Sequence, residues 1–156
     1  MSLDTIFSAG TTVVTAAHMN GLQASWDAYS PTWTAVTTNP ALGDGTLTGR
    51  YLRIGKTILF TITLTMGTTT TYGTGGWILS LPVAARSGRR AVGQVDILAG
   101  ANGYVGAGIV LGGTTSLFLA VPGTVAGGPD RSVATSVPVA WASGNTLAAT
   151  GAYEAA

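Results

Sequence analysis

The chain has 156 residues, of which 46% are hydrophobic and only 8% are charged. Its formal net charge of +1 is too small to attract nucleic acid or an anionic membrane over long range. The absence of cysteine excludes disulfides, thiolate metal sites and cysteine nucleophiles. This length suits one domain with an attached segment, and so little surface charge suits a protein that works in an assembly. We expect the attached segment over residues 1–30 and a β-domain over residues 31–156.

The first ten residues, MSLDTIFSAG, lack a basic region followed by a long apolar run, so they do not predict a secretion signal. An apolar stretch of about 18 residues without glycine, threonine or charge, as a membrane span would need, is also missing. We therefore expect no membrane insertion, and the lack of cysteine is compatible with folding in a reducing cytoplasm.

Residues 1 to about 14 are expected to form an extended arm, followed by one short helix from Thr15 to about Ala28. Thr15 can serve as the N-cap of this helix. A helix of this length is marginal alone in water, so its apolar stripe must pack on something. The stripe either covers the open side of its own sheet or meets its copies around a symmetry axis. The second alternative makes its four members candidate oligomer contacts: Met19, Leu22, Trp26 and Tyr29.

Beyond Pro31 the apolar pattern changes to the two-residue repeat of strands. It is clearest over Thr57–Met66, which predicts an apolar face toward the core and a threonine face toward water, with Leu59 as the exception on the wet face. The fold class expected is all-β, an antiparallel β-sandwich or jelly roll preceded by the arm and the short helix. Further strands are expected at Trp33–Thr37, Thr48–Ile54, Gly76–Leu81, Ala91–Ala99, Tyr104–Leu111, Ser116–Val121, Val133–Trp141 and Thr146–Tyr153.

Two glycine patterns resemble nucleotide-binding motifs but fail on their context. The run Gly49–Thr57 has five residues between its glycines, where a phosphate loop has four, and it leads into a strand and not a helix. We interpret Gly55-Lys56 as a two-residue hairpin turn between paired strands. The second pattern consists of Gly103, Gly106 and Gly108, whose spacing is the reverse of the dinucleotide-binding order. A need for small residues in a crowded strand or at a subunit contact explains these glycines better.

The chain shows no motif for catalysis, a metal or a cofactor, and we assign no residue to any of these. His18 is the one histidine, without a second histidine or a carboxylate nearby in sequence, and we interpret it as solvated or capping. Asp96 is the acid predicted within a strand and away from a turn, and it is expected to face solvent. Because two carboxylates far apart in sequence can meet in space, an enzyme stays a third hypothesis behind a structural protein and a binding module.

Two groups of side chains are candidates for ligand or partner contact. Arg86, Arg89 and Arg90 form the basic cluster of the chain, which either grips a phosphorylated polymer or an acidic patch of a neighbour, or only keeps its loop solvated. The aromatic residues either stack on sugar rings or pack in the core. The residues considered are Trp33, Trp77, Trp141 and Tyr104. Core packing is favoured for the tryptophans that lie within apolar alternation, and Tyr104 is the candidate for a sugar contact.

Three stretches of the chain resemble a module of tail-fibre and minor tail proteins from phages that infect Actinobacteria. The first is Phe7–Gly10 with Thr15–Asn20, and the third is Trp141–Leu147 with Gly151–Glu154. Residues from about 88 to 132 match nothing in that module. The second stretch is the most specific and comprises Pro31–Ala35, Leu42–Tyr51, Arg53–Thr57 and Trp77–Pro82.

The resemblance implies a β-sandwich on a phage particle, usually a homotrimer, and it brings no catalytic residues. Long shaft or collagen-like segments, common in such proteins, are missing from this sequence. The expected function is therefore that of a non-enzymatic virion protein, either a head on the tail or a capsid decoration protein, assembled in the host cytoplasm. Its arm is expected to contact other virion proteins. The alternative is a carbohydrate-binding module that recognises a host surface glycan.

Overall fold

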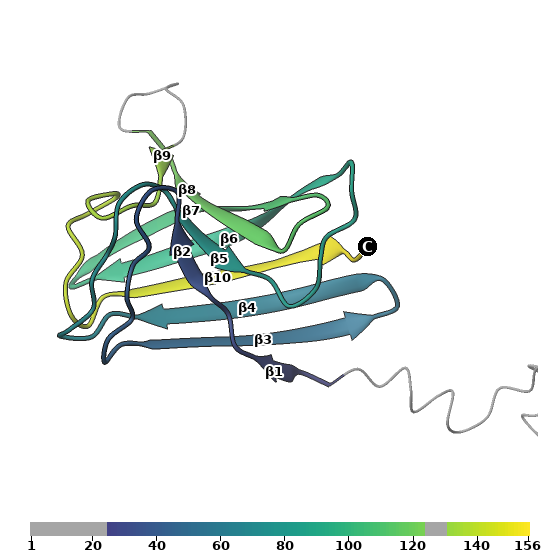
Figure 1. The fold of residues 1–156 in the computed structure, drawn as a ribbon, viewed down its shortest axis with the longest axis horizontal. Coiled ribbons are helices and arrows are strands. Elements are labelled where there is room, and N and C mark those ends of the chain that lie inside the picture. The colour runs from purple at the N-terminus through teal and green to yellow at the C-terminus, as the bar shows by residue number, and fades with distance from the viewer. Residues whose placement is uncertain (1–24, 124–130) are drawn as a thin grey trace, which may run out of the picture.

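The computed structural model describes residues 25–123 and 131–156, and this part of the chain is all-β and antiparallel (Figure 1). It contains no helix, and so none with the length and apolarity that crossing a membrane requires. The strands are β1 (Asp27–Tyr29), β2 (Trp33–Ala35), β3 (Thr46–Ile54), β4 (Thr57–Thr65), β5 (Trp77–Ser80), β6 (Arg90–Ala99), β7 (Asn102–Leu111), β8 (Ser116–Val121), β9 (Arg131–Ser132) and β10 (Thr146–Glu154).

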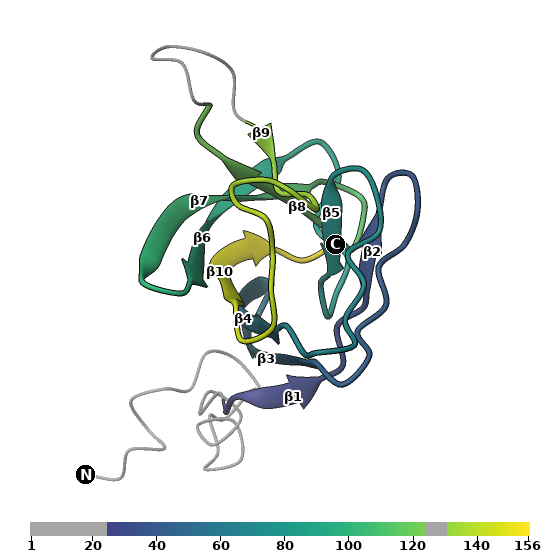
Figure 2. The same cartoon turned by 90° about the vertical axis from the view of Figure 1, so that its left-hand side faces the viewer.

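The strands form one curled sheet in the order β1-β3-β4-β10-β6-β7-β8-β5-β2, with β9 paired to β8. The curl brings the two end strands near each other, because only residues 30–32 separate β1 from β2 in the chain (Figure 2). The Thr32 amide donates to Ser80 Oγ at 2.8 Å, the Ser80 amide donates to the Thr32 carbonyl at 3.0 Å, and Tyr29 Oη donates to the Ser80 carbonyl at 3.2 Å. One short segment therefore ties both edges of the sheet, which leaves less free edge for unwanted pairing.

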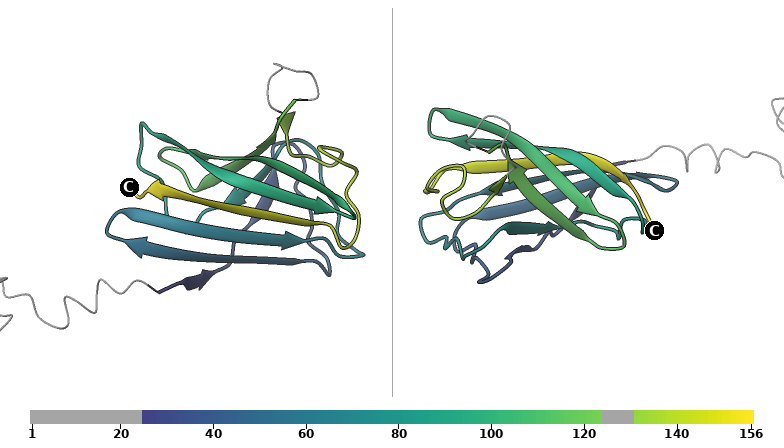
Figure 3. Two further views of the ribbon diagram at one scale, coloured as in Figure 1. Left: turned by 180° about the vertical axis from the view of Figure 1, so that it is seen from behind. Right: turned by 90° about the horizontal axis from the view of Figure 1, so that it is seen from above.

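Strand β4 lies between β3 and β10 and confirms the alternation predicted for it. Its register with each neighbour continues from Thr57 to Thr65 without a bulge. The side chains predicted to face the core are all buried: Ile58, Phe60, Ile62, Leu64 and Met66. The threonines between them lie on the outer surface of the sheet, which Figure 3 shows from behind.

Tight hairpins hold the long strands in register. Gly55 and Lys56 connect β3 to β4, as predicted, and Gly55 has a φ of 60°. Gly100 has a φ of 61° and with Ala101 connects β6 to β7 in the same way. A glycine with positive φ at the first of two loop residues is typical of a type II′ turn, whose twist matches that of the flanking strands.

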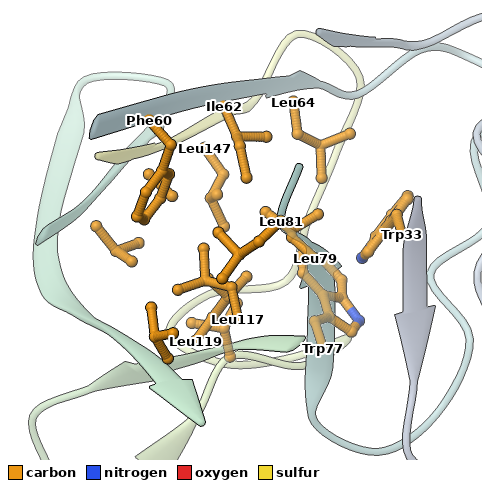
Figure 4. Close-up of a cluster of buried hydrophobic side chains, with 14 of the residues drawn as sticks. Trp33, Phe60, Ile62, Leu64, Trp77, Leu79, Leu81, Leu117, Leu119 and Leu147 are labelled. Atoms are coloured by element: carbon orange, nitrogen blue, oxygen red, sulfur yellow. The ribbon is translucent and has the colours of Figure 1, made fainter. Parts of the chain in front are cut away.

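Three tryptophans from distant parts of the chain form one side of the core. Trp77 is fully buried between Trp33, at 4.7 Å between ring centroids, and Trp141, at 4.8 Å. Trp77 Nε1 donates to the Tyr72 carbonyl at 3.0 Å, and Trp141 Nε1 donates to the Ala134 carbonyl at 2.9 Å. Figure 4 shows the aliphatic side chains that fill the space beside Trp33 and Trp77, from β4, β5, β8 and β10: Ile62, Leu64, Leu79, Leu117, Leu119 and Leu147.

Two predicted elements differ from the structure. Asp27 and Ala28, expected to end a helix, are part of strand β1 and pair with Tyr51 and Arg50 of β3, so this end of the predicted helix is wrong. The predicted strand Val133–Trp141 is also wrong, because the pairing with β8 ends at Ser132 and an irregular segment follows. The arm, the first part of the predicted helix with His18, and the predicted turn at residues 127–129 lie outside the described residues.

Two glycines of β7 are predicted to tolerate a methyl group very differently. A Cβ at Gly106 would lie 2.1 Å from the backbone oxygen of Ala120, whereas a Cβ at Gly103 would meet nothing within 4 Å. We expect Gly106→Ala to lower the free energy of unfolding by about 1–3 kcal/mol, and Gly103→Ala to leave it unchanged or raise it by up to about 1 kcal/mol. Urea unfolding of both variants checks this, and equal losses would contradict the close approach of β7 to β8.

Candidate functional site

The outer surface of the sheet is divided into a threonine face and an apolar strip. On β3, β4 and β10 many outward positions are threonine: Thr46, Thr48, Thr57, Thr61, Thr63, Thr65, Thr146 and Thr150. Leu52, Ile54 and Leu59 interrupt this face near the β3–β4 turn. These hydroxyls interact with water and carry no charge. Such a surface explains how the chain can have only 8% charged residues and still present a polar exterior.

The apolar strip lies on the other half of the sheet, over β5, β8, β7 and β6. Its centre is a row of side chains in register, in which Ile78 faces Phe118, Phe118 faces Ile109, and Ile109 faces Val92. Val92 is 66% exposed and Val105 58% exposed. Single exposed apolar residues are common, but a contiguous group on one surface marks a contact site. We use the term apolar strip for Ile78, Val92, Leu98, Val105, Ile109, Leu111 and Phe118. Gln94 and Asp96 lie on the same face of β6 between Val92 and Leu98, so the row from Ile78 to Val92 is its continuous part.

A shallow hollow borders this strip where β7 and β8 part. Pairing between the two strands ends at Ala107 and Ala120, and β8 continues with β9. The hollow has a volume of about 210 Å³, and no titratable side chain is among its lining residues, Gly106, Ala107, Ala120, Val121 and Pro122. It therefore extends the apolar surface and offers no acid, base or nucleophile.

The structure separates the residues of the predicted helical stripe that it describes. The Tyr29 ring packs against the core and contacts Tyr51 edge-on at 5.9 Å, and burial raises the pKa of its hydroxyl. Trp26 is 41% exposed, and its carbonyl accepts a hydrogen bond from Arg50 at 3.4 Å. Tyr29 thus serves its own subunit, and Trp26 stays a predicted oligomer contact. Met19 and Leu22 lie outside the described residues.

The arginines of the predicted basic cluster are all exposed, and they differ in their partners. Arg86 Nη1 lies 3.0 Å from a carboxylate oxygen of Glu154 and 3.1 Å from the other. Arg89 and Arg90 have no acidic partner within salt-bridge distance among the described residues. The ion pair is itself half exposed, so it contributes little to stability and mainly orients Arg86.

The aromatic residues considered as sugar contacts have mostly structural positions. Trp33, Trp77 and Trp141 are buried in the core, which confirms the expectation for Trp77 and Trp141 and removes Trp33 as an exposed sugar platform. Tyr104 is partly buried on β7 and packs against the core from that side. Of the four residues considered, Tyr104 alone keeps a surface that a glycan can reach.

The acids considered within the described residues have structural or solvated positions. Asp96 is exposed on the outer side of β6, as predicted. Asp44 accepts hydrogen bonds from Thr68 Oγ1 at 2.6 Å and from the amide and Oγ1 of Thr69 at 2.8 Å, which hold the pKa of its carboxyl well below the usual range. These hydrogen bonds connect the turn around residue 44 to the loop after β4. In residues 25–123 and 131–156, histidine and acidic side chains form no group of three that could hold a metal ion.

Comparison of the chain with protein-family models, with curated proteins and with solved structures finds no match in any of the three.

Proposed function

We propose that this protein is a non-enzymatic structural component of a bacteriophage particle, in which its β-domain, a sandwich or jelly roll in architecture, forms a homotrimeric head. The observation that carries the proposal is the apolar strip. Val92 exposes more than half of its surface in the single chain and is in register with three partly buried apolar neighbours, Ile109, Phe118 and Ile78. Val105, also more than half exposed, lies further along β7. Copies of the chain that cover one another would remove this surface from water.

The placement on a virion rests on the resemblance of the sequence to tail-fibre and minor tail proteins, and it agrees with the character of the surface. A virion protein is held in place by neighbours, so it needs little charge to stay dispersed. The threonine face of β3, β4 and β10 is suited to the solvent side of such an assembly. The apolar strip is suited to the side where subunits meet.

Immunogold labelling tests the virion location. An antibody raised against the purified protein is expected to label intact phage particles at one structure, either the tail or the capsid. Labelling of empty heads identifies a decoration protein, and labelling of tails alone identifies a tail head. Particles of an unrelated phage serve as the control. If the protein were found only in the soluble fraction of the lysate, with all particles unlabelled, the proposal would be refuted.

A second role, recognition of a host wall glycan, is compatible with the first and is favoured by the position of Tyr104. This ring has an inward position on β7, where it faces Ile97, and it is only partly buried, so part of its surface stays accessible. Wild-type protein is expected to bind wall glycan in a pull-down, and Tyr104→Ala is expected to lose that binding. Tyr51→Ala is the matched control, because Tyr51 is also partly buried and lies on distant β3. Equal binding by the wild type and both variants would remove this role from Tyr104.

A further inference from the structure

The cationic side chains of the chain are concentrated at one end of the sheet. Of the seven lysines and arginines in the sequence, five lie at the end where β3 turns into β4 and where the C-terminus is marked in Figure 1. Three of them form the arginine cluster recognised in the sequence, and the structure adds Arg53 and Lys56. We call this group the basic end: Arg53, Lys56, Arg86, Arg89 and Arg90.

Backbone hydrogen bonds bring these residues together from three separate segments. The Ala155 amide donates to the Lys56 carbonyl at 2.7 Å, and the Arg86 amide donates to the Glu154 carbonyl at 2.8 Å. The end of β10 therefore lies between the β3–β4 turn and the loop that carries the arginine cluster. Arg90 begins β6, which is the next strand beyond β10.

The basic end has a clear excess of positive charge over the rest of the described molecule. Glu154 is the acid within it, and it neutralises one of the five cations through its ion pair with Arg86. Another acid near this end is Asp27 of β1. It pairs with Tyr51 of β3, which is two residues before Arg53 in the chain. Arg53 Nε donates to the Gly55 carbonyl at 2.9 Å, which holds this guanidinium at the turn.

The layout of the cations fits an extended ligand and not a single small anion. All five side chains are exposed, so none of them walls a closed pocket. Strands β3 and β6 are three positions apart in the sheet, so the cations are spread along this end and not gathered around one point. A linear polymer with a charge on each repeat can touch several of these cations at once. Because four of the five are arginines, whose planar fork binds two oxygens of one phosphate, phosphate is the charge group that the set fits best.

We propose that the basic end binds a linear, phosphate-bearing polymer along the line from Arg53 and Lys56 to Arg89 and Arg90. Arg86 is already paired with Glu154, so it contributes less to this binding than the other four cations. The site adjoins the apolar strip at Arg90, which faces Leu111, and it lies away from Tyr104. It does not depend on the proposed virion location. Its affinity should fall steeply as salt is added, because exposed cations on a polyanion act mainly by releasing condensed counterions.

Binding of inorganic polyphosphate to the full chain, measured by calorimetry or fluorescence anisotropy at low salt, tests this. Arg89→Gln/Arg90→Gln is expected to weaken binding by at least about fivefold, and to reduce the slope of log affinity against log salt by about one to two. The matched control is Arg50→Gln/Arg131→Gln, which removes the same charge from exposed positions in mid-strand β3 and on β9. This control is expected to change affinity by less than about twofold, since its arginines lie off the binding line.

A third variant acts in the opposite direction. Glu154→Gln removes the anion of the basic end and releases Arg86, so it is expected to tighten polyphosphate binding by about twofold to fivefold. Circular dichroism should show all variants folded, because every substituted side chain is exposed.

Three results would overturn the proposal: no polyphosphate binding by the wild type, equal weakening by both double variants, or poly-L-glutamate binding as tight as polyphosphate. The last result would assign the surface to an acidic protein. A thymidine oligonucleotide of equal charge identifies the source of the phosphate, since binding tighter than that of polyphosphate indicates nucleic acid and weaker or equal binding indicates a phosphate polymer without bases.

Discussion

Replacing Trp77 by alanine is expected to lower the free energy of unfolding by about 3–5 kcal/mol. Trp77 is fully buried, contacts Trp33 and Trp141 within 5 Å between centroids, and donates a hydrogen bond to the Tyr72 carbonyl. Alanine would leave a large cavity and remove the closer of the two donors to the Tyr72 carbonyl. Because domains of this size are stable by only about 5–15 kcal/mol, the variant should be close to unfolding at room temperature. Urea denaturation followed by circular dichroism measures the change.

The matched control for Trp77 is Val36→Ala, one residue beyond β2 and near the same end of the core. Val36 is 67% exposed, so its truncation is expected to change stability by no more than about 0.5 kcal/mol. If both variants lost the same stability, burial of the tryptophan cluster would not be a major contribution to the core.

The substitutions Val92→Glu and Val105→Glu together are expected to convert the proposed trimer into folded monomers. Both positions face outward and are more than half exposed in the single chain, so glutamate there is solvated in the monomer. In an oligomer that covers the apolar strip, the same carboxylates would be desolvated without partners, a cost of several kcal/mol for each charge. Sedimentation velocity of the variant at the wild-type concentration measures the result.

The control for this pair carries the same added charge on the threonine face. Thr63→Glu/Thr150→Glu changes two exposed outward positions of β4 and β10, and it is expected to leave the assembly intact. Dissociation by both pairs alike would mean that negative charge in general, and not coverage of the apolar strip, controls assembly. A variant at Val92 and Val105 that stays trimeric would place the interface elsewhere.

The strands with strong two-residue alternation could be predicted from the sequence because their burial pattern is local. Strand β4 shows this best, since each alternate side chain from Ile58 to Met66 is buried. The turn at Gly55-Lys56 was also predictable, because glycine supplies the positive φ that a two-residue hairpin needs. Eight of the nine predicted strands are present, although several begin or end elsewhere.

The two failures have opposite physical causes, since one segment pairs with a distant strand and the other lacks such a partner. Asp27–Tyr29 lies in apolar spacing typical of a helix, but hydrogen bonds to β3 make it a strand. Val133, Val137 and Trp141 recur at the even spacing of one strand face, but Pro138 between them lacks the amide that a ladder needs. Their side chains are buried from an irregular segment, with Trp141 Nε1 bonded to the Ala134 carbonyl.

The candidate surfaces were only partly visible in the sequence. The arginine cluster at residues 86–90 is local and stands out by its charge, whereas Arg53 and Lys56 join it only through the order of β3, β4, β10 and β6. The apolar strip depends on register in the same way. Val92, Ile109 and Phe118 each look like ordinary strand residues, and they become a surface only when three strands align them.

The mass of the wild-type protein in solution tests the central claim most directly, because the apolar strip predicts self-association whatever the host or the docking partner. Light scattering on the purified chain is expected to give about 47 kDa, three times the 15.6 kDa of one chain, and to hold that value on dilution into the low micromolar range. A mass of 15.6 kDa that persists at high concentration would show that the apolar strip remains uncovered, and the account of this protein as a self-assembling structural component would be wrong.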